Sequence, residues 1–138
     1  MNIYQKTINL PAFDRGMHLI TNKIYNEIKD ILPDTGLLHL FIKHTSASLT
    51  LNENADPSVQ YDMNNFINNL IPDNTPYFTH TAEGPDDMPS HIKSSLFGNS
   101  LIIPITNGRL NLGTWQGIYL YEFRDYRKPR TIVATIIG

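Results

Sequence analysis

The pattern of apolar and polar positions predicts β-strands over three segments of the first half of the chain, at 2–10, 37–43 and 47–53. It is clearest in the second segment, where alternate positions from Leu38 to Ile42 are apolar. Residues two apart lie on one face of a strand, so this face is expected to pack against the core.

The pattern changes to helical spacing between the first two predicted strands. Apolar residues, among them Ile24 and Ile28, recur every three or four positions over 22–32, which predicts an α-helix. We expect Thr21 to cap the N-terminus of this helix and Pro33 to end it.

A second helix is predicted after the strand at 47–53. Asp56 and Pro57 stand in the order that helix starts prefer, a capping residue and then a proline, and Pro72 ends the apolar stripe that follows. Residues 71–90 are rich in polar residues, proline and glycine, which predicts a long loop of functional importance. A short helix over 89–97 is expected after it.

The C-terminal part of the chain is rich in strand-forming residues at 101–105, 117–123 and 131–137, and Asn107-Gly108 predicts a tight turn. These strands are apolar on both faces, which is expected where a second layer or another subunit covers the outer face. The sequence predicts an α+β fold of mainly antiparallel β-sheet layers with two or three helices, as a single domain over residues 1–138.

Composition excludes several classes of function. The 138 residues contain no cysteine, which removes disulfides, iron–sulfur clusters and thiol nucleophiles. The formal net charge of −2 and the lack of a basic run argue against nucleic acid or a membrane as a partner. No apolar stretch resembles a signal peptide or a membrane span, so we expect a cytoplasmic protein.

Three of the five histidines are candidate metal ligands. His44 ends the apolar face of a strand, His80 lies in the long loop, and His91 lies one turn into the helix after it. Three imidazoles on separate elements are typical of open metal sites, although scattered surface rings are the simpler interpretation. His18 and His39 show no comparable context.

Two carboxylates are candidates for supporting roles. Glu53, between two asparagines at a strand end, could orient a histidine or act as a general base. Asp87 lies four residues before His91, so it could cap the helix or reach the same ion. Asp56 is expected to be only a helix cap.

Gly113 and Gly117 bracket a further polar segment that contains Thr114, Trp115 and Gln116. Paired glycines indicate close backbone approach, which would hold Thr114 and Gln116 in a rigid frame. A tryptophan anchored in the core, with Gln116 as its hydrogen-bonded neighbour, is the alternative interpretation.

Three motifs that contain these residues resemble the YjbQ-like family, also called the secondary thiamine-phosphate synthase family. They are His44-Thr45-Ser46-Ala47-Ser48-Leu49-Thr50-Leu51-Asn52-Glu53-Asn54-Ala55-Asp56-Pro57, Glu83-Gly84-Pro85-Asp86-Asp87-Met88-Pro89-Ser90-His91-Ile92-Lys93-Ser94-Ser95-Leu96 and Gly113-Thr114-Trp115-Gln116-Gly117-Ile118-Tyr119-Leu120-Tyr121-Glu122-Phe123. The resemblance covers essentially the whole chain. It implies an α+β homotrimer with a polar pocket where the motifs meet, and a weak thiamine-phosphate synthase activity.

That activity joins a thiazole phosphate to a pyrimidine pyrophosphate and releases pyrophosphate, which favours a divalent cation at the leaving group. Under this interpretation the protein is a transferase that binds a small phosphorylated molecule. Histidine ligands favour zinc or a similar metal over magnesium. The expected roles are metal binding by His44, His80 and His91, catalysis by Glu53, Asp87 and Gln116, and substrate binding by Thr45, Ser46, Asn54, Lys93 and Thr114.

Two other classes of function stay open. A metal-dependent hydrolase of a small phosphorylated or amide substrate would use the same ligands. A metal-binding or metabolite-binding trimer without turnover would also fit the sequence.

Overall fold

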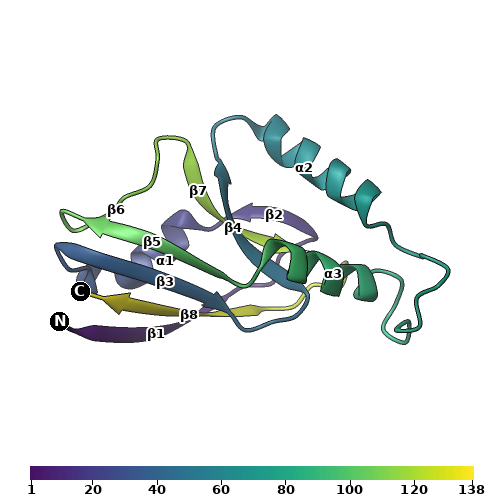
Figure 1. Ribbon diagram of the computed structural model, residues 1–138, viewed down its shortest axis with the longest axis horizontal. Coiled ribbons are helices and arrows are strands. Elements are labelled where there is room, and N and C mark those ends of the chain that lie inside the picture. The colour runs from purple at the N-terminus through teal and green to yellow at the C-terminus, as the bar shows by residue number, and fades with distance from the viewer.

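The computed structural model describes residues 1–138, which form two antiparallel sheets and three α-helices (Figure 1). In chain order the elements are β1 (Ile3–Leu10), β2 (Gly16–Leu19), α1 (Thr21–Ile28), the 3-10 turn η1 (Lys29–Ile31), β3 (Thr35–Ile42), β4 (Ala47–Glu53), α2 (Pro57–Leu70), α3 (Asp87–Phe97), β5 (Ser100–Thr106), β6 (Arg109–Leu110), β7 (Gln116–Glu122) and β8 (Arg130–Ile137). This architecture confirms the predicted α+β class.

The larger sheet has the strand order β1-β8-β3-β5-β6, and the smaller sheet has the order β2-β7-β4. In the larger sheet β3 lies between β5 and β8, with Leu38 opposite both Ile103 and Ile136. Strand β4 pairs with β7 along its whole length. The short hairpin from β5 to β6 turns at Asn107 and Gly108, which both have positive φ, as the predicted tight turn requires.

One hydrophobic core lies between the two sheets and α1. It joins side chains of the larger sheet, such as Leu40, to Leu49 and Leu120 of the smaller sheet and to Ile24 of the helix. A second, smaller cluster around Tyr119, Tyr121 and Phe123 packs against α2 and α3. Because β7 is buried on both faces, it is the strand that separates the two clusters.

The predicted helix start at Thr21 differs in detail from the structure. Residue Ile20 takes the capping position and Thr21 is the first helical residue. The Thr21 hydroxyl instead accepts a hydrogen bond from the Ile118 backbone N–H of β7. By contrast, Asp56 caps α2 as predicted, because its Oδ1 accepts from the Ser58 N–H at 2.9 Å.

Helix α3 and the connection that precedes it form one end of the molecule, on the right in Figure 1. The helix begins at Asp87, two residues earlier than predicted, and packs against β4. The preceding long connection therefore lies beside the first turn of α3. No helix of the protein combines the length and the apolar character that crossing a bilayer requires.

Candidate metal centre and adjoining hollow

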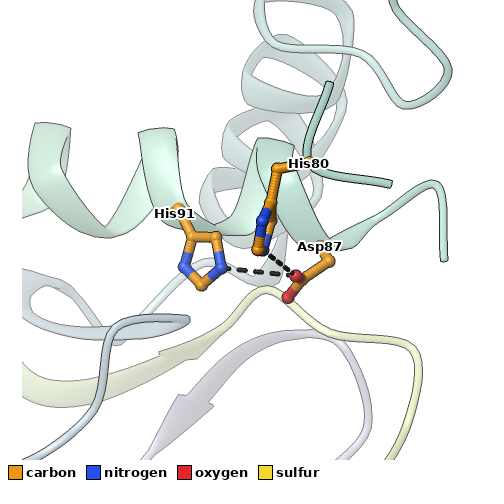
Figure 2. A group of neighbouring side chains, drawn as sticks. All are labelled: His80, Asp87 and His91. Atoms are coloured by element: carbon orange, nitrogen blue, oxygen red, sulfur yellow. Dashed lines mark ion pairs between the residues drawn. The ribbon is translucent and has the colours of Figure 1, made fainter. Parts of the chain in front are cut away.

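Three side chains converge at the start of α3: His80 from the long connection, Asp87 from the first position of the helix, and His91 one turn later (Figure 2). One potential ligand atom from each lies within 4.8 Å of the others. The Asp87 Oδ2 atom is 2.8 Å from His80 Nε2 and 3.3 Å from His91 Nε2. We refer to these three residues as the His–Asp–His cluster.

Asp87 Oδ2 is a buried polar atom without a hydrogen-bond partner. The Asp87 side chain is only 1% exposed, and its Oδ2 faces the two histidine nitrogens, each of which can donate to it only when that nitrogen carries a proton. A buried carboxylate oxygen left in this state is costly. The atom is therefore placed to bind a further group between the two imidazoles.

The other oxygen of Asp87 is held by Arg124. The Arg124 guanidinium donates to Asp87 Oδ1 at 2.5 Å, to Asp86 Oδ2 at 2.9 Å and to the Glu83 carbonyl oxygen at 2.9 Å. Burial raises the pKa of Asp87, but the charge of Arg124, together with contacts from His91, His80 and Glu83, lowers the net pKa below its ordinary value. Asp87 is thus an anion whose orientation Arg124 fixes.

The tautomer of His91 follows from its second contact. Its Nδ1 lies 2.8 Å from the carbonyl oxygen of Thr45, which can only accept, so Nδ1 carries the proton. In the neutral ring the lone pair is then on Nε2, the atom that faces Asp87. A histidine whose distal N–H binds a carbonyl is the usual arrangement of a metal ligand.

The structure does not place His44 in the cluster, although the sequence predicts it as a metal ligand. Its Nε2 accepts a hydrogen bond of 2.8 Å from the Thr131 backbone N–H, so this nitrogen already has a partner and Nδ1 carries the proton. Burial lowers the pKa of His44, and the positive charges of Arg130 and Lys128 lower it further. His44 is therefore a neutral imidazole beside the cluster, with Nδ1–H as its hydrogen-bond donor.

Of the predicted substrate-binding residues Thr45, Ser46 and Lys93, two are buried. Ser46 is enclosed, and its carbonyl accepts from Arg130. Lys93 is 1% exposed and donates to Asn68 Oδ1 at 2.8 Å. Only the third of these residues, Thr45, is exposed beside the cluster.

The remaining predicted residues lie at the far end of β4 and β7. Glu53 pairs with Gln116 there, while Thr45 meets His91 at the opposite end of β4. A strand of the length of β4 spans about 20 Å, so one chain does not unite these groups. The roles expected for Glu53, Asn54, Thr114 and Gln116 therefore find no support from proximity to the cluster within one chain.

The structure explains the glycine-bracketed segment as a turn. The Gln116 side chain accepts from the Gly113 N–H, and a Cβ on Gly117 would lie 2.5 Å from Leu19 Cδ1, which confirms the predicted close approach. Trp115 is 62% exposed, so the interpretation as a core anchor is wrong.

Two hollows flank the cluster. The larger, with a volume of about 670 Å³, is lined by polar residues that include His44, Thr45 and His91. The smaller, of about 230 Å³, has His80, Phe78 and Met88 in its lining. Each histidine of the cluster thus borders a different hollow, which would give a bound ligand access from two sides.

Sequence reasoning missed Arg124 and the pair formed by Glu122 and Arg130. The Arg130 Nε donates to Glu122 Oε1 at 2.7 Å, and both side chains are fully buried where the smaller sheet meets the larger one. Arg124 and Asp87 are 37 residues apart, and no spacing rule connects them. The one available signal was the run of six charged residues in the segment 122–130, between two apolar strands.

These features define an α+β protein with a histidine–carboxylate cluster at one end of two packed antiparallel sheets. The model of the UPF0047 protein YjbQ-like family matches residues 6–138. The chain therefore belongs to the YjbQ/UPF0047 family, which confirms the resemblance found in its motifs.

Individual relatives agree with this assignment. The chain is 54% identical over 136 residues to the UPF0047 protein YjbQ of Escherichia coli O157:H7, covering 98% of both chains. A YjbQ/UPF0047 family structure from Clostridium acetobutylicum is 36% identical, with a TM-score of 0.81 and coverage of 99% and 100% of the two chains. A hypothetical protein of Aeropyrum pernix K1 superposes with a TM-score of 0.87 at 28% identity, covering 98% of each chain.

Proposed function

We propose that this protein is a metal-dependent enzyme acting on a small phosphorylated molecule, with zinc or a similar cation held by His80, Asp87 and His91. The observation that carries the proposal is the unpartnered, buried Oδ2 of Asp87 between two imidazole nitrogens. A cation shared by the three atoms would satisfy all of them.

The geometry of the cluster fits such an ion. In a tetrahedral zinc site with ordinary bond lengths, ligand atoms lie about 3.3 Å apart. Asp87 Oδ2 is 2.8 and 3.3 Å from the two nitrogens, so small side-chain adjustments would complete the site. Three protein ligands leave one position for a substrate atom, as in catalytic rather than structural zinc sites.

Without a cation, the contact between His91 and Asp87 requires a second proton on the imidazole. Nδ1 already donates to Thr45, so a neutral His91 would aim its Nε2 lone pair at the carboxylate. Either a proton or a metal ion must occupy the space between them. The approach of His80 to the same oxygen, at 2.8 Å, favours one cation shared by both rings.

When bound, the cation would act as a Lewis acid that stabilises negative charge on a leaving group. The protein's own residues would hold and orient the ligands of the cation. Arg124 would hold Asp87 in its ionised form, and the Thr45 carbonyl would fix the tautomer of His91. The thiamine-phosphate synthase reaction, with pyrophosphate as leaving group, is the specific reaction that we propose for this site.

The test combines metal content with turnover. Protein stripped by a chelator is reloaded with zinc, and elemental analysis is expected to show one ion per chain. Pyrophosphate release from a thiazole phosphate and a pyrimidine pyrophosphate should then require the ion and should disappear in Asp87→Asn, while His39→Ala should match the parent protein. Metal binding without turnover would reject the enzyme in favour of a binding protein, and no metal binding would reject the site.

The same proposal includes assembly as a homotrimer. The outer face of the larger sheet supports this because it carries exposed apolar side chains, of which Ile102 is 63% exposed. Neighbouring positions on this face are Leu37 and Phe41 of β3 and Ile3 of β1. Light scattering should give the mass of three chains at micromolar concentration, and Ile102→Lys should lower it. A monomeric parent protein would contradict the trimer.

A further inference from the structure

The larger hollow beside the His–Asp–His cluster has a chemical character that the cluster alone does not explain. It lies between the segment that precedes β4 and the C-terminal half of α3, and it has a volume of about 670 Å³. None of its lining residues is apolar and none is a carboxylate. The side chains of Thr45, Ser95 and Asn99 supply hydroxyl and amide groups that can donate hydrogen bonds.

His44 adds a donor of fixed orientation to this lining. Because the Thr131 N–H occupies its Nε2, the neutral ring carries its proton on Nδ1, the one polar atom left to meet a ligand. Thr131 is the second residue of β8, so a sheet strand holds the ring in place. The donor therefore needs no reorganisation when a ligand arrives.

The charges around His44 are mainly positive. Arg130, Lys128 and Lys43 all act on the ring as positive charges, whereas Glu122 is the opposing negative charge. Glu122 and Arg130 form one buried ion pair whose charges offset each other, so the remaining charges near the ring are those of Lys128 and Lys43. A hollow lined by hydrogen-bond donors, without a carboxylate and with two lysines near its His44 ring, favours an anion over a neutral or positive ligand.

We propose that this hollow is an oxyanion subsite that binds the phosphate group of the substrate, with His44 Nδ1–H, Thr45 and Ser95 as donors. The inference deepens the proposed function and rests on it for the cation, which would lie on the far side of His91. His91 belongs to both parts, as a ligand of the cation and as a wall of the hollow. His44 would then donate a hydrogen bond to the phosphate instead of binding the metal ion.

The experiment titrates inorganic phosphate into the protein by calorimetry, in zinc-loaded and chelator-treated forms. Ser95→Asp places a negative charge in the hollow at an exposed position, so it should weaken phosphate binding by at least about tenfold in both forms. Ser58→Asp makes the same chemical change at an exposed position on α2, near the far end of β4, and should leave phosphate affinity unchanged. His44→Phe keeps a ring of similar shape without the donor and should weaken phosphate binding as well.

The outcomes separate the subsite from the metal centre, because metal content is measured independently for each protein. Phosphate binding that responds to Ser95→Asp in a protein without metal affinity would uphold the hollow and reject the proposed enzyme. Phosphate binding that requires zinc and ignores both Ser95→Asp and His44→Phe would overturn the subsite and leave the metal centre intact. Absence of phosphate binding in both forms would also overturn the subsite.

Discussion

The Nδ1 atom of His91 donates a hydrogen bond of 2.8 Å to the carbonyl oxygen of Thr45, across 46 residues of sequence. This bond joins the first half of α3 to the segment that leads into β4. His91 belongs to the cluster, and both bonded residues line the larger hollow. The bond also directs Nε2 toward Asp87. One backbone carbonyl thus fixes both the tautomer and the direction of a candidate ligand.

Removing either histidine of the cluster should remove the metal. His80→Ala and His91→Ala each take away one of three ligands, and elemental analysis after zinc loading should show loss of stoichiometric metal. His18→Ala, His39→Ala and His44→Ala should keep it, because these residues lie outside the cluster. Full metal content in His80→Ala or His91→Ala would show that the missing ring is not a required ligand.

Arg124 should control metal affinity without touching the ion. Arg124→Gln releases Asp87 Oδ1 and the Glu83 carbonyl, so Asp87 loses its fixed orientation. Loss of such a supporting contact typically weakens metal binding by about 10–100-fold. Competition with a chromophoric chelator measures the affinity. Arg127→Gln is the matched control, since that exposed guanidinium contacts Asp14 instead, and equal affinities in the two variants would contradict the role of Arg124.

Much of the fold could be predicted because its elements carry strong local patterns. Strand β4 has its predicted bounds and helix α2 has its predicted start, because period-two alternation and the Asp56-Pro57 signal depend only on neighbouring residues. Strand β2 (Gly16–Leu19) was missed because four residues are too few to show a period. The capping role predicted for Thr21 is wrong because its hydroxyl binds the Ile118 N–H, which is 97 residues away in the sequence.

The site was predictable only where its residues are close in sequence. Asp87 and His91 are four apart on one helix, so their shared face follows from helical spacing. The partner of His44 is a strand backbone 87 residues away, and sequence spacing does not reveal it. The burial of Lys93 could not be predicted either. A lysine beside hydroxyl residues is typical of a phosphate site, and the sequence does not show which face of the helix is buried.

The buried pair of Glu122 and Arg130 should behave as one unit in stability. Arg130→Met leaves a fully buried carboxylate without its partner, so we expect the free energy of unfolding to fall by about 3–5 kcal/mol. Replacing both residues, Glu122→Leu with Arg130→Met, should recover a large part of the loss because no uncompensated charge remains. Denaturant unfolding of both variants measures the difference. A double variant less stable than Arg130→Met would contradict this explanation.

Lys93 should make stability depend on pH. Burial, and secondarily the charge of Arg15, lowers the pKa of Lys93 to about 8 from 10.5. Between these values the unfolded chain binds a proton that the folded chain does not, so stability should rise with pH, by at most about 1.4 kcal/mol per pH unit. Burial raises the pKa of Tyr121 to about 12, which works in the opposite direction above pH 10. Unfolding measurements should therefore cover pH 7.5 to about 9.5, below the titration of ordinary tyrosines.

Lys93→Met removes the buried charge and should abolish this rise. The variant should be more stable than the parent at pH 7 by about 1–3 kcal/mol, because a buried cation is replaced by an apolar side chain of similar length. Asn68 Oδ1, the acceptor of the Lys93 hydrogen bond, keeps a second donor in Arg15 Nη2 at 3.0 Å. Lys23→Met, at an exposed lysine, should keep the slope of the parent. If stability follows the same curve against pH in the parent and in Lys93→Met, Lys93 is not the group that titrates.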